Sequence, residues 1–583
     1  MKRLLMIVVA AALAALLICY TLGRAGPHAS TAAVTGLLPR DTLFFAVIPD
    51  FDRTRLRSHD LDIYKLWHEA AVQGFLNKPL TKLPTAANAQ ETFRDFDLLH
   101  PTNAFIAVTA IEASAWKIVG GFHFVGSETD AEKITSRWRS KLLQGHAEMQ
   151  HQSMDYQKHR IEIDTAGIVT VATAYDANWF IAANDGEQLK LVLDRIDGRQ
   201  DSRNDPLAGD EVLQAALKHM PAKYDALAYA RVDRWTKNFK TPAGDVAATA
   251  DANSMLRQIN SFCGTLSFED GRMHDVMFAG MPKLDGVGDL ARITLKLATK
   301  DAFLYAGTGQ SISSANATLR TLASSLGVNA IPPEEFARAF GSEFGLIGEW
   351  PADARAPSLW TALPVKDPAA AEAIVKSLTA QGEWTQETRD GIRYFTMHFG
   401  QGLISFSPTI GLSDQLLIAG SDANSVEHAM KRPSGASDSL ENLPSFQTAE
   451  RSVPTAQQTF SYFDSAMLYS WLDTTLRPML LISAAFIPGM AENVDLNKLP
   501  SVDTITKHLS PIVLSQSYAT DGYVSESKGP VTASIAFAGL GGIVGGGAYF
   551  YQHQMGGGLG IFGSRIPQMQ PSPTPSATPD ATP

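Results

Sequence analysis

The sequence has very little cysteine, with two cysteines among 583 residues. Cys19 lies in an apolar stretch near the start of the chain, so Cys263 is the only cysteine beyond that stretch. This excludes an internal disulfide in the rest of the chain, and stability must come from buried apolar side chains. With 45% apolar residues, the chain is long enough for about two to four domains with their own cores.

An excess of basic residues is also absent. Lys and Arg number 49 against 60 Asp and Glu, which gives a net charge of -11. Nucleic-acid binding needs a concentrated basic surface, and no stripe of Lys or Arg interleaved with aromatic residues is present. We therefore expect no nucleic-acid partner.

The familiar catalytic motifs are missing as well. The chain has neither the GxSxG turn of serine hydrolases nor a glycine-rich phosphate loop followed by lysine, and "GGGLGIFG" from Gly556 lies in a glycine-rich tail. Cys263 falls in "SFCGTLSF", a predicted strand in which a buried thiol is more common than a nucleophile. The sequence predicts no catalytic residue and no cofactor.

The chain does contain a strong membrane signal at its start. Lys2 and Arg3 precede an uncharged apolar stretch from Leu4 to Leu22. At about 1.5 Å per residue, this stretch nearly matches a hydrocarbon core of roughly 30 Å. Residues 1–30 are therefore predicted to be a signal anchor or a cleaved signal peptide, and the lack of a clear small-x-small cleavage site favours the anchor. The positive-inside rule then predicts an inner-membrane protein with its bulk in the periplasm or otherwise outside the cytoplasm.

An internal repeat is the most informative feature of the remaining sequence. Asn178–Ile196 aligns with Asp414–Met430 at a constant offset. In both stretches an apolar run ends at an aspartate, Asp185 or Asp422, and apolar residues then follow at helical spacing. The repeat predicts two copies of a strand, a capping aspartate and an amphipathic helix.

Further matches occur in the same order along the chain. They predict two tandem modules, 36–285 and 295–530, each an α+β unit with antiparallel sheets and amphipathic helices. The matched stretches are Asp41–Val47 with Asp301–Gly307, Val125–Ile134 with Val365–Ile374, Met220–Asp233 with Val453–Ala466, and Ser267–Gly271 with Ser517–Gly522.

The stretch "DTLFFAVIPDFDRTR" contains the first candidate site. Asp50 and Asp52 form a DxD pattern, which is a possible metal ligand pair. The second module has "TGQSISS", Thr308–Ser314, at this place and lacks these charges. We therefore predict that the aspartates begin a helix, and that the arginines after them pair with Asp60, Asp62 or solvent.

A group of histidines and methionines forms the second candidate site. His146, His151 and His159 lie close together with two methionines, and such side chains can bind copper or zinc. Their spacing is not that of a zincin helix, and the second module has no histidine there. We predict a polar connection between a helix and a strand, with no metal.

The end of the chain allows two interpretations. Residues 531–551 carry no charge and are a possible second transmembrane segment, although their glycines weaken a helix. Alternatively, the stretch at Ile535 is a last strand that repeats the one at Val276. We favour the first interpretation because it keeps the strand, turn and strand before Val531 in order. Residues 552–583, rich in Gly and then in Pro, Ser and Thr, are predicted to be disordered.

Three phrases give the chain a family resemblance. "LPRDTLFFAVIPDFDRTR", "YKLWHEAAVQGFL" and "SQSYATDGYVSESKGP" resemble an uncharacterised family of predicted bacterial envelope proteins that carry a domain of unknown function. The resemblance implies the same compartment and an α+β fold, and it implies no activity.

The sequence therefore predicts a non-catalytic, membrane-anchored protein of the cell envelope that binds a protein partner or organises an assembly. One alternative is a periplasmic carrier of an apolar, lipid-like ligand in a cavity within a module. The other is a metal-dependent enzyme that uses Asp50 and Asp52 or the histidine group.

Overall fold

The computed structural model describes most of the two predicted modules. No helix of the described ranges is both long enough and apolar enough to cross a membrane. The predicted anchor, residues 537–551 of the possible second span and the predicted tail lie outside the described residues. The described residues are 31–81, 95, 98–112, 115–143, 150–167, 169–199, 205–238, 257–284, 287–309, 331–351, 354, 356–380, 383–398, 407–432, 437–483 and 495–536.

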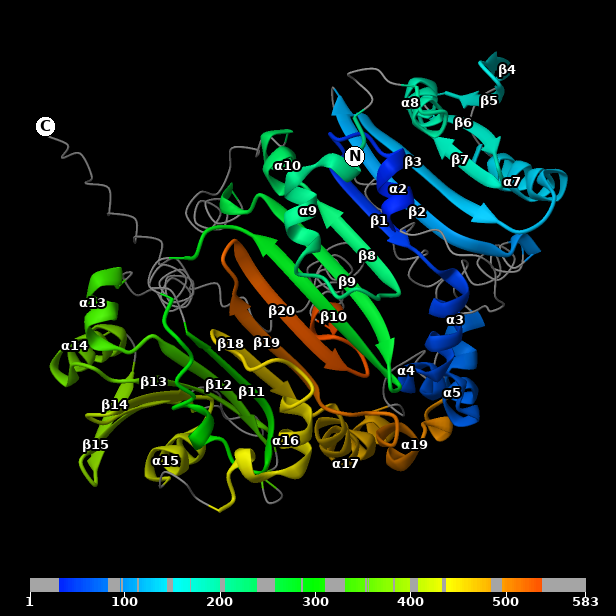
Figure 1. Cartoon of the computed structure of the whole chain (residues 1–583). Helices are drawn as coiled ribbons and strands as arrows, with labels where there is room; N and C mark the ends of the chain where they lie inside the picture. The colour runs from blue at the N-terminus through cyan, green and yellow to red at the C-terminus, as the bar shows by residue number, and fades with distance from the viewer. Residues whose placement is uncertain are drawn as a thin grey trace, which may run out of the picture. The chain divides into compact units, whose positions relative to one another are not determined.

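Antiparallel strands form the centre of the fold (Figure 1). In the first half they pair in the spatial order β4-β5-β6-β7-β3-β2-β1-β8-β9-β10. Their bounds are β1 (Phe44–Ile48), β2 (Pro101–Glu112), β3 (Ala115–Phe124), β4 (Gln150–Tyr156), β5 (His159–Ala166), β6 (Val169–Asp176), β7 (Trp179–Ala183), β8 (Ala226–Ala230), β9 (Ser261–Glu269) and β10 (Arg272–Gly280).

The strands of the second half pair in the corresponding order, β14-β15-β16-β17-β13-β12-β11-β18-β19-β20. Their bounds are β11 (Ala302–Gly309), β12 (Glu343–Glu349), β13 (Ser358–Pro364), β14 (Trp384–Arg389), β15 (Ile392–Met397), β16 (Thr409–Leu412), β17 (Leu416–Gly420), β18 (Thr459–Phe463), β19 (Ile512–Tyr518) and β20 (Gly522–Gly529).

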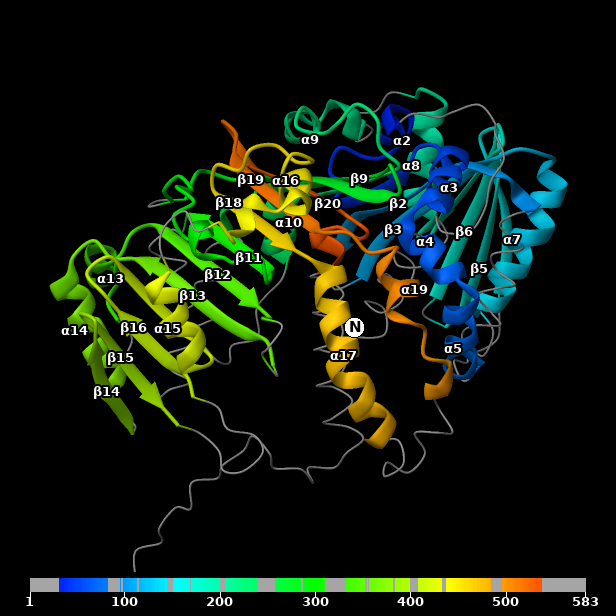
Figure 2. The same ribbon diagram turned by 90° about the horizontal axis from the view of Figure 1, so that it is seen from below.

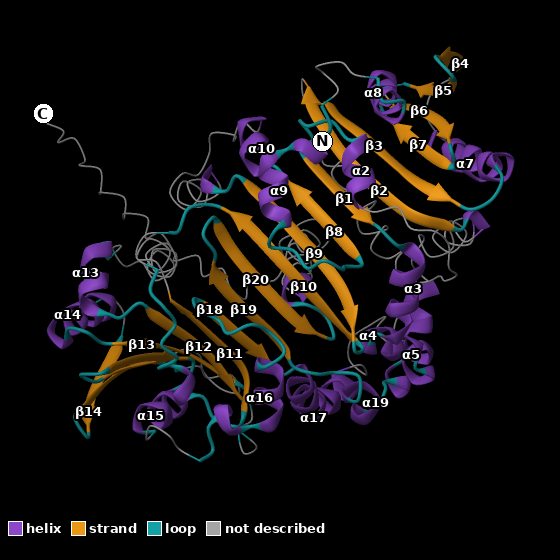
Figure 3. Ribbon diagram, viewed as in Figure 1, coloured by secondary structure: helices purple, strands orange, loops and turns teal. Residues whose placement is uncertain are grey.

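The last strand of each half joins the two series. β10 pairs with β20 in antiparallel fashion, from Met273 opposite Gly529 to Gly280 opposite Gly522. All described strands therefore belong to one continuous sheet (Figure 3), and the described residues up to Ala533 form one compact unit. Because β10 and β20 hold the same place in the two pairing orders, their antiparallel pairing relates the halves by an approximate two-fold axis.

Helices flank the sheet and complete a mixed fold of helices and antiparallel strands, so the predicted α+β class is confirmed. Figure 2 shows α17 and α19 on the same side of the sheet as α5. In the first half the helices are α2 (Thr31–Leu37), α3 (Phe51–Asp60), α4 (Asp62–His68), α5 (Ala70–Thr81), α7 (Glu128–Leu143), α8 (Gly186–Ile196), α9 (Glu211–Leu217) and α10 (Val232–Asn238). In the second half they are α13 (Pro333–Ala339), α14 (Pro368–Thr379), α15 (Ala423–Lys431), α16 (Pro444–Glu450), α17 (Ser465–Ser483) and α19 (Val502–Thr506).

The two predicted strand-to-helix turns are confirmed. Asp185 follows β7 and accepts hydrogen bonds from the backbone N–H groups of Glu187 and Gln188, at 2.8 and 3.3 Å. Asp422 follows β17 and accepts one from Ser425 at 2.8 Å. Such caps satisfy backbone donors that the first helical turn leaves free. Leu189, Val192 and Leu193 of α8 and Val426 and Ala429 of α15, which lie at helical spacing, are buried.

The two halves also have similar cores. Phe45 of β1 lies opposite Tyr229 of β8, and Tyr305 of β11 lies opposite Tyr462 of β18. All four rings are completely buried. Cys263 is buried in β9 within the first core, as its sequence context predicts. Large aromatic side chains therefore occupy matching positions in the cores of both halves, where each buries a large apolar area.

The end of the fold distinguishes the two interpretations of the C-terminal stretch. β20 ends at Gly529 and pairs with both β19 and β10. Residues 534–536 are helical, so the alternative that places a strand at Ile535 is wrong for the residues that the structure describes there.

Candidate functional site

Asp50 and Asp52 lie at the start of α3. The Asp50 side chain accepts a hydrogen bond from the Arg53 backbone N–H at 2.9 Å, so Asp50 caps the helix as predicted. Asp52 lies in the first turn, where a negative charge interacts favourably with the helix dipole. Both residues therefore have a structural role at the helix start.

Two arginines of this stretch, Arg53 and Arg57, have a different partner from the one that the sequence suggests. We expected pairing with Asp60, Asp62 or solvent, but Arg53 Nε contacts Asp225 Oδ1 at 3.2 Å. Arg57 lies 3.7 Å from the other oxygen of the same carboxylate. Asp225 is completely buried and also accepts a hydrogen bond from the Phe268 backbone N–H at 2.7 Å. A buried carboxylate needs such partners because its desolvation is costly.

The position of Asp225 has an uncharged counterpart in the second half. Asp225 immediately precedes β8, and Gln458 holds the same position before β18. Gln458 is buried and uncharged, and the stretch Thr308–Ser314 contains no arginine that would pair with an acid there. Neither the acid nor the arginines therefore occur at the corresponding places in the sequence of the second half.

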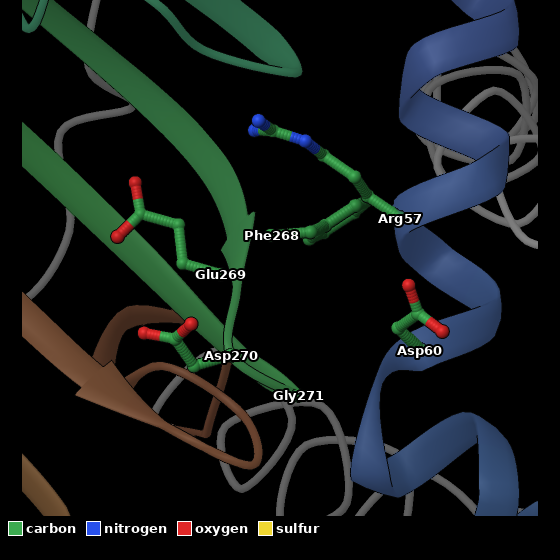
Figure 4. A pocket seen from close by; sticks show the side chains of 6 residues that line it. All are labelled: Arg57, Asp60, Phe268, Glu269, Asp270 and Gly271. Carbon is green, nitrogen blue, oxygen red and sulfur yellow. The ribbon is translucent and has the colours of Figure 1, made fainter.

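A pocket of about 420 Å³ lies beside this ion pair. Figure 4 shows Arg57 and Asp60 on α3 facing the turn between β9 and β10. The residues that line the pocket are Arg57, Asp60, Phe268, Glu269, Asp270 and Gly271. The turn is held in place because the Asp62 backbone N–H donates to the Gly271 carbonyl at 2.7 Å.

The pocket has a predominantly charged lining. It carries one guanidinium and three carboxylates, with no serine, cysteine or histidine among the lining residues. Glu269 is moreover engaged with Lys528 of β20 at 3.4 Å. The pocket therefore resembles a charged surface depression next to the joint of the two halves.

The structure does not bring the candidate histidines together. His146 lies outside the described residues. His151 is on β4 opposite Asp164, and His159 is at the start of β5 opposite Tyr156, so five residues of β5 separate the two positions. At about 3.3 Å per residue, that distance is far too long for a shared metal.

The two candidate histidines that the structure describes, His151 and His159, contact carboxylates instead. His151 Nδ1 lies 2.7 Å from Asp164, and its Nε2 lies 3.0 Å from Glu162. His159 is buried and contacts Asp197 at 3.0 Å. No group of three potential metal ligands occurs in the described parts of the chain. The predicted polar connection is also wrong for residues 150–156, which form β4 of a hairpin.

The outermost strands of the sheet are the most open surface of the fold. Among the described residues, β4 pairs only with β5 and β14 only with β15. Most side chains of β4 and β14 are exposed, and none is buried. The nearly continuous runs of polar residues in "QHQSMDY" and "WTQETR" are the sequence signal of these edges. Sequence reasoning did not identify them because an edge is defined by a missing neighbour.

Comparisons with known proteins add little. No family model and no curated protein matches the chain. Three solved crystal forms of TP0453 are similar at 7–9% identity with TM-scores of 0.23–0.24. They cover 42–43% of this chain and 79–81% of their own. At this level the likeness supports no argument about function.

Proposed function

We propose that this chain is a non-catalytic envelope protein, anchored in the inner membrane by residues 1–30, whose exported part binds a protein partner through the edges of its sheet. The observation that carries the proposal is the exposure of β4 and β14. The anchor and the export rest on the sequence, through Lys2, Arg3 and the apolar stretch that follows them.

The second element of the proposal is an internal duplication. The pairing order of the strands recurs in the two halves, and the opposed aromatic pairs Phe45–Tyr229 and Tyr305–Tyr462 hold equivalent positions. Duplication gives the chain two equivalent outer hairpins, β4–β5 and β14–β15, at the two ends of one sheet. Two linked binding elements bind a multivalent partner far more tightly than either element alone.

Edge strands have a specific binding capacity. Half of the backbone N–H and C=O groups of an edge strand point away from the sheet and can pair with an added strand. Asp390 and Gly391 join β14 to β15 with positive φ angles of 52° and 77°, as in a two-residue hairpin turn. The residues that flank such a turn, Arg389 and Ile392, bond to each other, so Gln386 directs its N–H away from β15.

The described interior favours this function over the carrier of an apolar ligand. A carrier needs a concave apolar cavity of several hundred Å³. In both halves the space between sheet and helices contains fully buried side chains, among them Phe45, Tyr229, Tyr305 and Tyr462. The outer edges of β4 and β14 are exposed instead, so they suit the recognition of an extended protein segment.

The test is site-specific photo-cross-linking of the full-length protein in its own envelope. A photoreactive residue at Gln152 or Gln386 should give a discrete adduct with a protein, whereas one at the exposed helix positions Glu187 and Glu334 should not. Gln386→Pro removes the outward N–H and should abolish the adduct formed from a probe at Thr388, whereas Gln386→Ala keeps that N–H and the adduct. Adducts that form equally from edge and helix probes, or that survive the proline, contradict the proposal.

The membrane orientation has a separate test. A phosphatase that is active only outside the cytoplasm, fused after Pro583 of the full-length chain, is active if the chain has one span and inactive if residues 531–551 form a second. The same enzyme fused within residues 239–256, between α10 and β9, should be active in either case. Inactivity at that position contradicts the export of the two halves.

A further inference from the structure

The joint between the two halves, which we call the seam, consists of the paired strands β10 and β20 and the side-chain contacts around them. Three histidine–carboxylate pairs connect the halves at or beside this pairing. Each of them joins a residue before position 285 to one after position 495. The pairs are His274 with Glu526, His219 with Asp521, and His508 with Glu69.

His274 is the central member of the seam. It lies on β10, with Nε2 at 2.8 Å from Glu526 of β20 and Nδ1 at 3.5 Å from Glu269 of β9. Lys528 of β20 is the opposing charge, and it also contacts Glu269. The hydrogen bond to Glu526 raises the pKa of His274 above its usual value, although burial and Lys528 act in the opposite direction. The imidazolium form is thus favoured when the seam is closed.

The other two pairs lie around the seam. His219, after α9, contacts Asp521 in the turn between β19 and β20 at 2.8 Å, and its ring stacks on Phe278 of β10 at 4.3 Å. His508, after α19, contacts Glu69 between α4 and α5 at 2.8 Å, and Lys507 shares that carboxylate. Lys507 and His508 lower the pKa of Glu69, so its carboxylate stays charged as the pH falls.

We propose that the seam is a pH-sensitive clamp, in which protonation of His274 between Glu526 and Glu269 holds the two halves together and neutralisation loosens β10 from β20. The clamp goes beyond partner binding, because it concerns how firmly the two halves that carry the binding edges are joined. A protein exposed outside the cytoplasm meets changes of pH directly, and histidine is the side chain that titrates in that range.

The sign follows from linkage. A group that binds its proton more tightly in the closed state stabilises that state fully below its open-state pKa, near 6.5 for histidine. The stabilisation is lost as the pH rises through the raised pKa of the closed state. The seam should therefore be tightest below about pH 6 and should loosen as the pH rises above the ordinary pKa of histidine.

Hydrogen exchange of the full-length protein, followed by mass spectrometry and corrected for the intrinsic pH dependence of exchange, tests the clamp. Between pH 5.5 and 8, peptides of β10 and β20 should lose protection by clearly more than about twofold, because the proton that stabilises the closed seam is lost in this range. Peptides of β12 and β13 serve as the internal reference and should change by less than about twofold, since they lie away from the seam in the pairing order.

Matched variants identify the groups responsible. Glu526→Gln removes the main interaction that favours the charged imidazole and should abolish most of the pH dependence of β10 and β20. His274→Asn should do the same and leave protection at the alkaline level at both pH values. His151→Asn, which alters a histidine between carboxylates outside the seam, should leave the pH dependence intact. Equal changes in seam and reference strands, or an unaltered pH dependence in Glu526→Gln, overturn the proposal.

This test does not depend on the partner. Loss of edge cross-linking with an intact pH response would refute partner binding and leave the clamp standing. Intact cross-linking without a pH response at β10 and β20 would refute the clamp and leave partner binding standing.

Discussion

Replacement of Asp225 by alanine is the perturbation whose effect follows most directly from the structure. The Asp225 carboxylate is completely buried and has three kinds of contact. Arg53 Nε lies at 3.2 Å, the Phe268 N–H donates at 2.7 Å, and the Thr54 hydroxyl lies at 3.4 Å. Asp225→Ala removes the acceptor of all three contacts at once. The substitution therefore weakens the attachment of α3 to β8 and β9.

The magnitude can be worked from these contacts. An unsatisfied buried N–H at Phe268 costs about 1–3 kcal/mol. Loss of one partner from a buried ion pair costs about 3–5 kcal/mol when the remaining charge stays buried. The side chain of Arg53 is 29% exposed and keeps its bond to the Tyr224 carbonyl, so the second cost is at the low end or below it. We expect Asp225→Ala to reduce the free energy of unfolding by about 3 kcal/mol in total.

Urea unfolding of the full-length protein in non-ionic detergent, followed by tryptophan fluorescence, measures this loss. Asp225→Asn keeps an acceptor for the Phe268 N–H and should lose about half as much. Asp60→Asn removes an exposed charge from the same helix and should change stability by less than about 0.5 kcal/mol. A loss below about 1 kcal/mol in Asp225→Ala would refute the reasoning, because the carboxylate would then not fix α3 to the sheet.

Three further predictions concern the local structure. Asp422→Ala should lower the free energy of unfolding by about 1 kcal/mol through loss of the helix cap. Asp185→Ala should lower it further, because Asp185 also pairs with Lys117. Equal losses of stability for the two variants in thermal unfolding would contradict this. Burial raises the pKa of the Cys263 thiol to about 12, so in a Cys19→Ser background iodoacetamide at pH 8 should label Cys263 only after unfolding in urea. Gln386→Pro on the edge strand should change the unfolding midpoint little, whereas Ile347→Pro in β12, between β11 and β13, should prevent folding; similar losses would show that β14 is not an edge.

Much of the fold was predictable because its signals are local in the sequence. Asp185 and Asp422 each follow an apolar strand and precede a helical pattern, and both cap as expected. The turn formers Asp270 and Gly271 lie between β9 and β10, where residues of these types favour a hairpin turn. Comparison of the two halves strengthened these signals, since each feature was seen twice.

Contacts between distant parts of the chain were not predictable. Arg53 and Asp225 are 172 residues apart, and nothing near either residue indicates the other. The pairing of β10 with β20 was not predictable for the same reason, because nothing in the sequence of either strand indicates the other. The histidine pairs of the seam follow from that joining and are equally invisible in the sequence.

Native mass spectrometry tests the central claim most directly. The full-length protein, extracted gently from its own envelope, is compared with the Gln386→Pro and Gln386→Ala variants. The proposed function predicts a stoichiometric protein partner with the wild type and with Gln386→Ala, and loss of that partner with Gln386→Pro. A chain that carries no protein but holds about one lipid-sized molecule in all three forms would contradict partner binding at the sheet edge and establish the carrier in its place.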